Sequence, residues 1–186
     1  MLNEKMISLL PFETDRLIIK PTSVDDIEMI LKMDKQEDTQ KYLGGIKNKT
    51  REERIAFLEK KNNKFKDGHA GSLTVYLKDG TPIGFTGLSI DEDNNKAEIS
   101  YIFDRDYTGK GYASEVCRKL ISIGFDELGL NKIYADTISG NNRSKVLLER
   151  LGFTLEGVRR EDAYIKNTNE YKDFLDYGLL KKEYKK

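Results

Sequence analysis

The residues best suited to chemistry lie in one glycine-containing stretch, Tyr107-Thr108-Gly109-Lys110-Gly111-Tyr112-Ala113-Ser114. Gly109 and Gly111 carry no Cβ, so a loop that contains them can turn tightly and bring its backbone close to a ligand. A helical pattern follows at once, and the first N–H groups of a helix lack intrahelical partners and lie at the positive end of its dipole. Such groups bind phosphate, and Lys110 would add a positive charge. The loop therefore either holds a ligand with a diphosphate or is only a tight connection.

Other chemistries find less support in the sequence. The chain has neither Gly-x-x-x-x-Gly-Lys-Ser/Thr nor a Gly-x-Gly-x-x-Gly after a first strand with an acid about 20 residues further on. Its single histidine, His69, and single cysteine, Cys117, make neither an internal disulfide nor a multi-cysteine metal site. We expect no metal. Cys117 falls on an apolar helical stripe, so we expect it to be a core residue rather than a nucleophile.

The elements around the glycine loop predict how it is held. KAEISYIF (96–103) and NKIYADTI (131–138) have the composition of strands, and between them the apolar residues recur at helical spacing from Ala113 to Leu128. A strand, a helix and a strand imply a right-handed parallel crossover. The glycine loop then lies where the first strand ends and the helix begins.

The rest of the chain predicts a mixed α/β domain. Strands are expected at 15–20, 72–78, 82–90, 153–158 and 171–180, and helices at 23–33, from Thr50 onward, and at 142–151. The two strands before 96–103 join it in an antiparallel meander, so the sheet is mostly antiparallel, with helices on both faces and one parallel pair. Two polar stretches, 34–49 and 159–170, are expected to be irregular loops.

Composition limits the possible partners. The 186 residues include 32 Lys and Arg and 32 Asp and Glu, so the chain is formally neutral and has no overall field to hold a nucleic acid. No stretch reaches the roughly 18 apolar residues of a membrane span, and the first residues, MLNEKMISLLPFETDR, show no small-residue cleavage site. We expect one domain over residues 1–186, cytoplasmic, without membrane or direct nucleic-acid binding, as a monomer or homodimer.

Several motifs together resemble one family. Thr108-Gly109-Lys110-Gly111-Tyr112-Ala113 resembles the Arg/Gln-x-x-Gly-x-Gly/Ala signature of the GNAT superfamily of N-acetyltransferases. Thr14-Asp15-Arg16-Leu17-Ile18-Ile19 resembles its opening strand, and Asn141-Asn142-Arg143-Ser144, followed by Leu148 to Phe153, resembles its Asn-x-x-Ser helix and Leu-Gly-Phe ending. Tyr171-Lys172-Asp173 and the closing residues 178–184 resemble the tail of one branch, the N-terminal acetyltransferases of ribosomal proteins. These motifs span nearly the whole chain in the order and spacing of the family.

The resemblance implies a GNAT-like sheet and a site for acetyl-CoA. The co-substrate would lie in a V between strands 96–103 and 131–138, with backbone groups of the first strand holding its pantetheine arm and polarising its thioester carbonyl. The residues implied to bind it are Tyr101, Ile102, Phe103, Thr108, Gly109, Lys110, Gly111, Tyr112, Ala113, Ser114 and Asn141. Thr108 departs from the Arg or Gln of the family, which predicts weaker binding of CoA.

Two further residues are candidates for catalysis. Glu98 is our candidate for the base that takes a proton from the amine, and an exposed strand carboxylate is the alternative interpretation. Many relatives have a tyrosine four residues before the glycine that ends the second helix, and Leu148 stands there instead. Ser144 is the candidate proton donor that the resemblance implies. Asn141 and Ser144 also fit an ordinary helix cap and an ordinary first-turn residue.

The sequence therefore predicts an enzyme that transfers an acetyl group from acetyl-CoA directly to a primary amine in a ternary complex. The leading hypothesis for the acceptor is the α-amino group of a protein or peptide. One alternative is a small amine, such as a polyamine, an amino acid or an aminoglycoside. Another is a module that binds acyl-CoA without turning it over.

Overall fold

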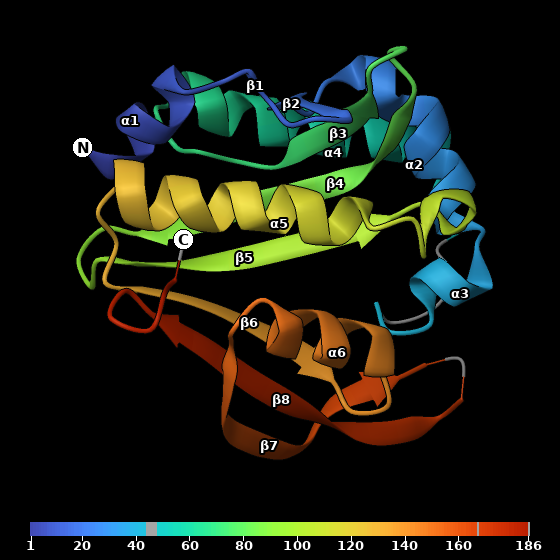
Figure 1. Cartoon of the computed structure of the whole chain (residues 1–186). Coiled ribbons are helices and arrows are strands. Elements are labelled where there is room, and N and C mark those ends of the chain that lie inside the picture. Colours follow the sequence, from blue (N-terminus) through green and yellow to red (C-terminus); the bar gives the residue numbers. More distant parts are fainter. Residues whose placement is uncertain (44–47, 167, 186) are drawn as a thin grey trace.

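The computed structural model describes residues 1–43, 48–166 and 168–185. Within them, eight strands form one sheet in the order β1-β2-β3-β4-β5-β6-β8-β7. Neighbouring strands are antiparallel except β5 and β6, which are parallel (Figure 1). The strands are β1 Phe12–Glu13, β2 Leu17–Pro21, β3 Leu73–Leu77, β4 Pro82–Asp91, β5 Lys96–Phe103, β6 Lys132–Ile138, β7 Thr154–Ile165 and β8 Glu170–Leu180.

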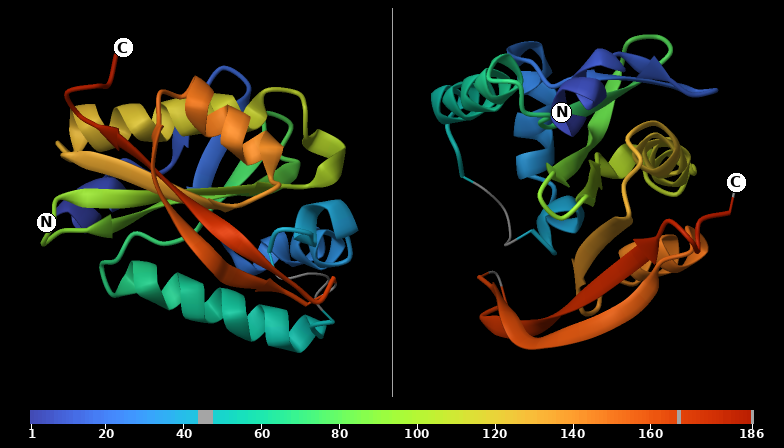
Figure 2. Two further views of the ribbon diagram at one scale, coloured as in Figure 1. Left: turned by 90° about the horizontal axis from the view of Figure 1, so that it is seen from below. Right: turned by 90° about the vertical axis from the view of Figure 1, so that its left-hand side faces the viewer.

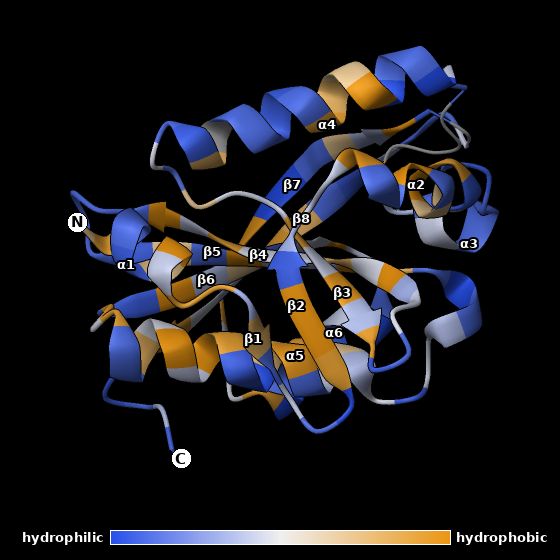
Figure 3. Ribbon diagram, turned by 90° about the horizontal axis from the view of Figure 1, so that it is seen from above, coloured by the Kyte–Doolittle hydropathy of each residue, from blue (hydrophilic) through white to orange (hydrophobic). Residues whose placement is uncertain are grey.

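Helices cover both faces of this sheet, as the sequence predicts. Figure 3 shows α2, α3 and α4 on one side and α5 and α6 on the other, and Figure 2 shows the same two layers from further directions. The helices are α1 Leu2–Ser8, α2 Ile27–Asp34, α3 Glu37–Gln40, α4 Arg51–Lys66, α5 Tyr112–Ser122 and α6 Asn142–Arg150. The mixed α/β class and the single parallel pair, 96–103 with 131–138, are confirmed.

The crossover helix α5 holds the glycine loop against the sheet. Its apolar stripe packs into the main core with at most 3% of each side chain exposed: Val116, Cys117, Leu120 and Ile121. The α-helix ends at Ser122 rather than Leu128, because a π-helical turn, Ile123–Glu127, follows. Gly124 allows this turn to approach β6, since a Cβ there would lie 2.7 Å from Cδ1 of Ile133.

Local signals explain where several helices begin and end. Thr50 and Glu53 form the predicted capping box at the start of α4, with the Thr50 hydroxyl accepting from the N–H of Glu53. Asn141 caps α6, and Gly152 ends it with φ of 93°. These ends depend on a few neighbouring residues, which is why the sequence locates them well.

The stretch after α6 differs from the expectation. Residues 159–165 belong to β7, which extends seven residues beyond the predicted end at 158 because its pairing with β8 continues through irregularities at Leu155/Gly157 and Arg159/Ala163. The predicted irregular loop at 159–170 is therefore wrong. The other loop, 34–49, contains the short helix α3, and its residues 44–47 lie outside the described residues. The sequence analysis also missed α1 and β1.

Among the described residues, no helix combines the length and the hydrophobicity needed to cross a membrane.

Candidate active site

A large cavity opens where the two parallel strands separate. β5 and β6 pair only at Lys96↔Lys132, Ala97↔Ile133 and Glu98↔Tyr134, and the ladder stops there. Beyond this point a cavity of about 1460 Å³ extends between the strands and reaches the N-termini of α5 and α6. Residues 99–103 of β5 line it, so backbone N–H and C=O groups on this edge of β5 are left without partners on β6 and can bind amides of a ligand.

Nearly all of the predicted site residues lie around this one cavity. They are Glu98, Tyr101, Ile102, Phe103, Thr108, Gly109, Gly111, Tyr112, Ala113, Ser114, Asn141 and Ser144. Lys110 is the exception: it is exposed, and its ammonium lies 5.1 Å from the centre of the Tyr107 ring. The structure therefore gives Lys110 no direct place in the cavity wall.

The N-terminus of α5 fits a phosphate group. Gly109 and Gly111 have φ of 77° and 84°, the left-handed region in which a Cβ causes strain. The first N–H of the helix with a backbone acceptor is that of Glu115, which bonds to Gly111 O. In the described part of the chain, the N–H groups of residues 112–114 have no such acceptor, and all three residues face the cavity. These free donors match an anionic diphosphate.

Residues just before β2 hold this loop in place. The Arg16 Nε donates to Glu115 Oε2 at 2.6 Å, and its Nη1 donates to the carbonyl of Lys110 at 3.0 Å. The Thr14 hydroxyl donates to the same carboxylate at 2.6 Å. Burial raises the pKa of Glu115, but these hydrogen bonds outweigh it and the net pKa is lowered, so the carboxylate stays charged. The guanidinium also lies over the ring of Tyr112 at 4.6 Å.

The other side of the loop is attached to α2. Lys32 forms ion pairs with Asp104 at 2.6 Å and Asp106 at 2.5 Å, and Gln36 donates to Asp104 Oδ1 at 2.7 Å. Asp104 is buried, so its charge is compensated by these partners rather than by water. The glycine loop is thus fixed between β2 and α2, and its backbone donors are preorganised.

Glu98 lies where β5 and β6 separate. Its side chain is partly buried, and burial raises its pKa, with a further increase from the negative charge of Asp136 on β6. Tyr134 is its register partner on β6, and Ser89 is its partner on β4. A carboxylate with a raised pKa is a stronger base than an exposed glutamate.

Ser144 and Asn141 meet at the start of α6. The Ser144 N–H donates to Asn141 Oδ1 at 3.3 Å, which is the cap interaction expected from the sequence. The Ser144 hydroxyl lies 2.8 Å from the hydroxyl of Tyr101 on β5. This contact was not predicted from the sequence, where only the backbone of Tyr101 was assigned to the site. Leu148 is fully buried in the main core, away from the cavity wall.

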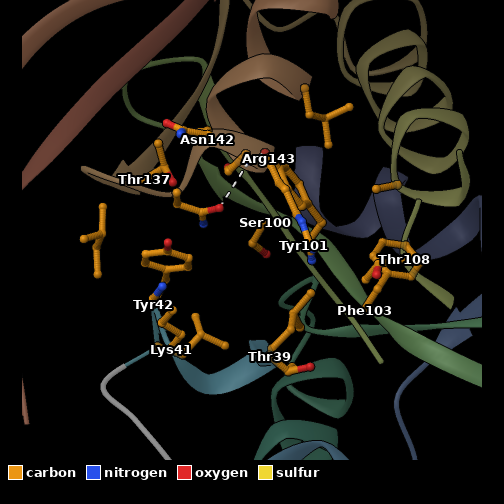
Figure 4. A pocket seen from close by; sticks show the side chains of 18 of the residues that line it. Thr39, Lys41, Tyr42, Ser100, Tyr101, Phe103, Thr108, Thr137, Asn142 and Arg143 are labelled. Atoms are coloured by element: carbon orange, nitrogen blue, oxygen red, sulfur yellow. Dashed lines mark hydrogen bonds between the residues drawn. The ribbon is translucent and has the colours of Figure 1, made fainter. Parts of the chain in front are cut away.

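The view in Figure 4 shows how the wall is assembled from distant parts of the chain. Thr39 belongs to α3 and Lys41 and Tyr42 follow it, and these residues line the same cavity as Thr137 of β6 and Asn142 of α6. The Tyr42 hydroxyl donates to the carbonyl of Gly140 at 2.8 Å, which joins this loop to the connection between β6 and α6. The sequence analysis missed Tyr42, because no local pattern distinguishes it from other loop tyrosines.

A smaller cavity of about 300 Å³ continues from the first one between the sheet and helices α2 and α4. The two share Ser100, Tyr101 and Ile102 of β5 in their walls. Its charged residues are Asp34, Arg54 and Lys61, and Arg54 forms a buried ion pair with Asp34. Among the residues that the structure describes, no cluster of His, Cys, Asp or Glu could hold a metal ion.

The mixed sheet, the separation of β5 from β6 and the glycine loop at the start of α5 agree with the acetyltransferase fold that the sequence predicts. The family model for the acetyltransferase (GNAT) domain matches residues 16–154. The chain belongs to the GNAT acetyltransferase family, and it is an acetyl-CoA-dependent N-acetyltransferase.

Individual relatives agree with this assignment. The chain is 31% identical over 173 residues to the uncharacterized N-acetyltransferase p20 of Bacillus licheniformis, covering 92% of this chain and 96% of p20. It is 38% identical over 109 residues to a Bacillus subtilis protein with the provisional name ribosomal N-acetyltransferase YdaF, a match that spans 58% of each chain.

Solved structures show the same fold. A spermidine N-acetyltransferase from Vibrio cholerae, in complex with CoA and spermine, has a TM-score of 0.79 at 22% identity and covers 91% of this chain and 98% of its own. A ribosomal-protein-S5-alanine acetyltransferase from Vibrio fischeri has a TM-score of 0.76 at 20% identity and covers 95% and 100%.

Proposed function

We propose that this enzyme transfers the acetyl group of acetyl-CoA directly to the α-amino group of a protein or peptide. The observation that carries this choice of acceptor is the pairing of the carboxylates around the cavity. Asp38 is paired with Arg105 at 3.2 Å, and Asp136 with Arg159 at 3.2 Å. Within the described residues, Glu98 is then the carboxylate of the cavity wall without an ion pair.

This charge distribution suits an acceptor with a single amine. A polyamine carries several positive charges and needs several free carboxylates, whereas the wall also contains the basic residues Lys41, Arg143 and Arg150. In the smaller cavity Arg54 is already paired with Asp34, and Lys61 lies among apolar side chains such as Phe57, which favours an uncharged part of the acceptor. The main cavity exceeds the roughly 300–1,000 Å³ of ordinary small-molecule pockets, which leaves room for both substrates.

The proposed chemistry assigns one task to each group. Glu98 takes a proton from the incoming ammonium, directly or through water, so that the neutral amine can attack the thioester carbonyl carbon. Backbone groups of residues 101–103 bind the pantetheine arm and the carbonyl oxygen, and the N-terminus of α5 binds the diphosphate. As the C–S bond breaks, its electron pair stays on sulfur, and the Ser144 hydroxyl supplies a proton there. The nitrogen loses its second proton to water as the amide forms, and water returns a proton to Ser144. Asn141 caps the helix that carries Ser144.

The names of the relatives and structural neighbours include both classes of acceptor, ribosomal proteins and polyamines. YdaF and the Vibrio fischeri enzyme carry names of ribosomal-protein acetyltransferases, and the Vibrio cholerae enzyme is a spermidine acetyltransferase. The charges of the cavity support the first class of acceptor, and the second is the alternative that an assay must exclude.

An acceptor panel tests the proposal. Release of CoA is measured with a peptide that has a free α-amino group, the same peptide blocked at its N-terminus but carrying a lysine, a free amino acid, and spermidine. We expect kcat/KM for the free peptide to exceed the others by at least about tenfold, which corresponds to about 1.4 kcal/mol of transition-state stabilisation. Faster turnover of spermidine would contradict the proposal. Binding of CoA without release in any reaction would instead indicate a non-catalytic module.

A further inference from the structure

Two hydroxyl groups meet across the cavity, and one of them has no role in the chemistry described so far. Tyr101 on β5 and Ser144 on α6 lie 43 positions apart in the chain, and their hydroxyl oxygens are 2.8 Å apart. This hydrogen bond links the strand that lines one wall to the helix that lines the other.

The Tyr101 ring is held in place by packing. It lies on the same face of β5 as Ile99 and Phe103, which are two residues away on either side, and the ring packs against the main core. A partly buried tyrosine usually needs a hydrogen-bond partner for its polar tip. Ser144 provides it. Burial raises the pKa of Tyr101, and the hydrogen bond with Ser144 only partly offsets this, so the phenol stays protonated and able to donate.

The Ser144 backbone is also fixed, because its N–H is bound by Asn141 at the cap of α6. A serine hydroxyl has one hydrogen and rotates freely about its Cβ–Oγ bond, so its donor direction depends on its neighbours. When Tyr101 donates to the Ser144 oxygen, that oxygen is the acceptor, and the serine hydrogen points elsewhere. Ser144 faces the cavity, so its hydrogen is available to a group bound there.

We propose that Tyr101 is a positioning residue for acetyl transfer: it donates to the Ser144 oxygen and thereby directs the serine O–H toward the thioester sulfur. This inference rests on the proposed function, in which Ser144 is the proton donor. An aliphatic hydroxyl is a much weaker acid than a thiol, so Ser144 can give up its proton only if a second proton replaces it. The Ser144 proton passes to the sulfur, and the Tyr101 proton passes to Ser144. The phenolate then regains a proton from water, and water takes up the second proton of the amine nitrogen as the amide forms.

A double-mutant cycle tests the proposal. Ser144→Ala is expected to lower kcat by about 10²-fold, as for loss of a general acid. Tyr101→Phe keeps the ring and removes the hydroxyl, so water must supply the second proton to a Ser144 hydroxyl that is no longer oriented. This variant is expected to lower kcat by about tenfold with KM for acetyl-CoA unchanged. Because Tyr101 acts through Ser144, the double variant should have the kcat of Ser144→Ala alone.

Tyr177→Phe is a matched control. Tyr177 is a buried core tyrosine on β8 whose hydroxyl has no hydrogen-bond partner within the described residues, so removing that hydroxyl should leave kcat within about twofold. Thermal unfolding of all variants establishes that they remain folded.

The outcomes separate this inference from the proposed function. Losses that multiply in the double variant, an unchanged kcat in Tyr101→Phe, or an increase only in KM for acetyl-CoA would each overturn the role of Tyr101 and leave that of Ser144 intact. An unchanged kcat in Ser144→Ala would remove the proposed donor itself, and the role of Tyr101 with it.

Discussion

At the scale of single residues, the site depends on a few groups whose surroundings differ from water. Glu98 is an ordinary carboxylate by sequence, and its position where β5 and β6 separate makes it basic. Burial disfavours its charged form, and the nearby negative charge of Asp136 adds to that effect. The basicity of Glu98 is therefore a property of where the sheet places it.

The pH dependence of the reaction should report on Glu98. As the base it must be deprotonated, so kcat/KM should fall as the pH decreases through its raised pKa. Asp136→Asn removes a negative charge that favours the protonated form, which lowers the pKa of Glu98. The acidic limb of the pH–rate profile should therefore move to lower pH, and Glu98→Gln should lower kcat by about 10²-fold or more.

Asp162→Asn is the control for this measurement. Asp162 pairs with Arg159 at 3.1 Å, as Asp136 does at 3.2 Å, but it does not line the cavity. The control variant should leave the acidic limb where it is. A profile that does not move in Asp136→Asn would show that another group titrates in the reaction.

At the scale of elements, the glycine loop and the first turn of α5 act as one unit. Two distant elements hold it: Arg16, just before β2, binds Glu115 and Lys110, and Lys32 on α2 binds Asp104. The resulting rigidity matters because backbone donors bind an anion without reorganising only if they already point the right way. The opening motif Thr14-Asp15-Arg16 therefore supports the glycine loop proposed to bind the diphosphate, although it is far from that loop in sequence.

Gly111→Ala tests this arrangement. Gly111 has φ of 84°, and a Cβ there would lie 3.3 Å from Nη2 of Arg16. An alanine must therefore shift the backbone or displace the Arg16 side chain that holds the loop. Loss of a hydrogen bond to a charged group costs about 1.5–3 kcal/mol, so the Kd for CoA measured by calorimetry should rise at least about tenfold.

Gly129→Ala provides a comparison with similar backbone strain. Gly129 has φ of 70°, and a Cβ added there would meet no other atom within 4 Å. The strain should lower the stability of the variant by roughly 1 kcal/mol. Because Gly129 is outside the cavity wall, the variant should bind CoA normally. Equal CoA binding by Gly111→Ala and the parent would mean that the diphosphate binds elsewhere.

At the scale of the whole molecule, the sheet is continuous at one end and divided at the other. The short parallel ladder between β5 and β6 connects β1–β5 to the antiparallel group β6, β8 and β7, and the cavity occupies the divided end (Figure 1). On the far side, the hydrogen bond from Tyr42 to Gly140 joins the two parts again. A ligand in this cavity contacts both parts at once.

Binding of CoA should therefore stabilise the whole fold. At a free concentration of 100 times Kd, mass action adds about 2.7 kcal/mol to the free energy of unfolding. For a domain of this size that corresponds to an increase in Tm of roughly 5–10 °C, measured by thermal unfolding with and without CoA. Gly111→Ala at the same CoA concentration should show a smaller increase. No increase in the parent protein would contradict binding of CoA to the native state.

Much of this molecule can be predicted from the sequence because the relevant signals are local. Strand 96–103, the cap at Thr50 and the glycine that ends α6 follow from a few adjacent residues, and the buried position of Cys117 follows from helical periodicity. Local patterns also located the glycine loop before a helix. The family resemblance supplied the other candidate site residues, and nearly all of the candidates lie around the cavity.

Only the tertiary structure decided which side chains meet. The register of β5 against its neighbours and the placement of α6 bring Tyr101 to Ser144, and the extent of pairing between β5 and β6 leaves Glu98 beside Asp136. The length of β7 likewise depends on β8 rather than on its own residues. Contacts between residues far apart in sequence arise from packing of whole elements, and no local pattern encodes them.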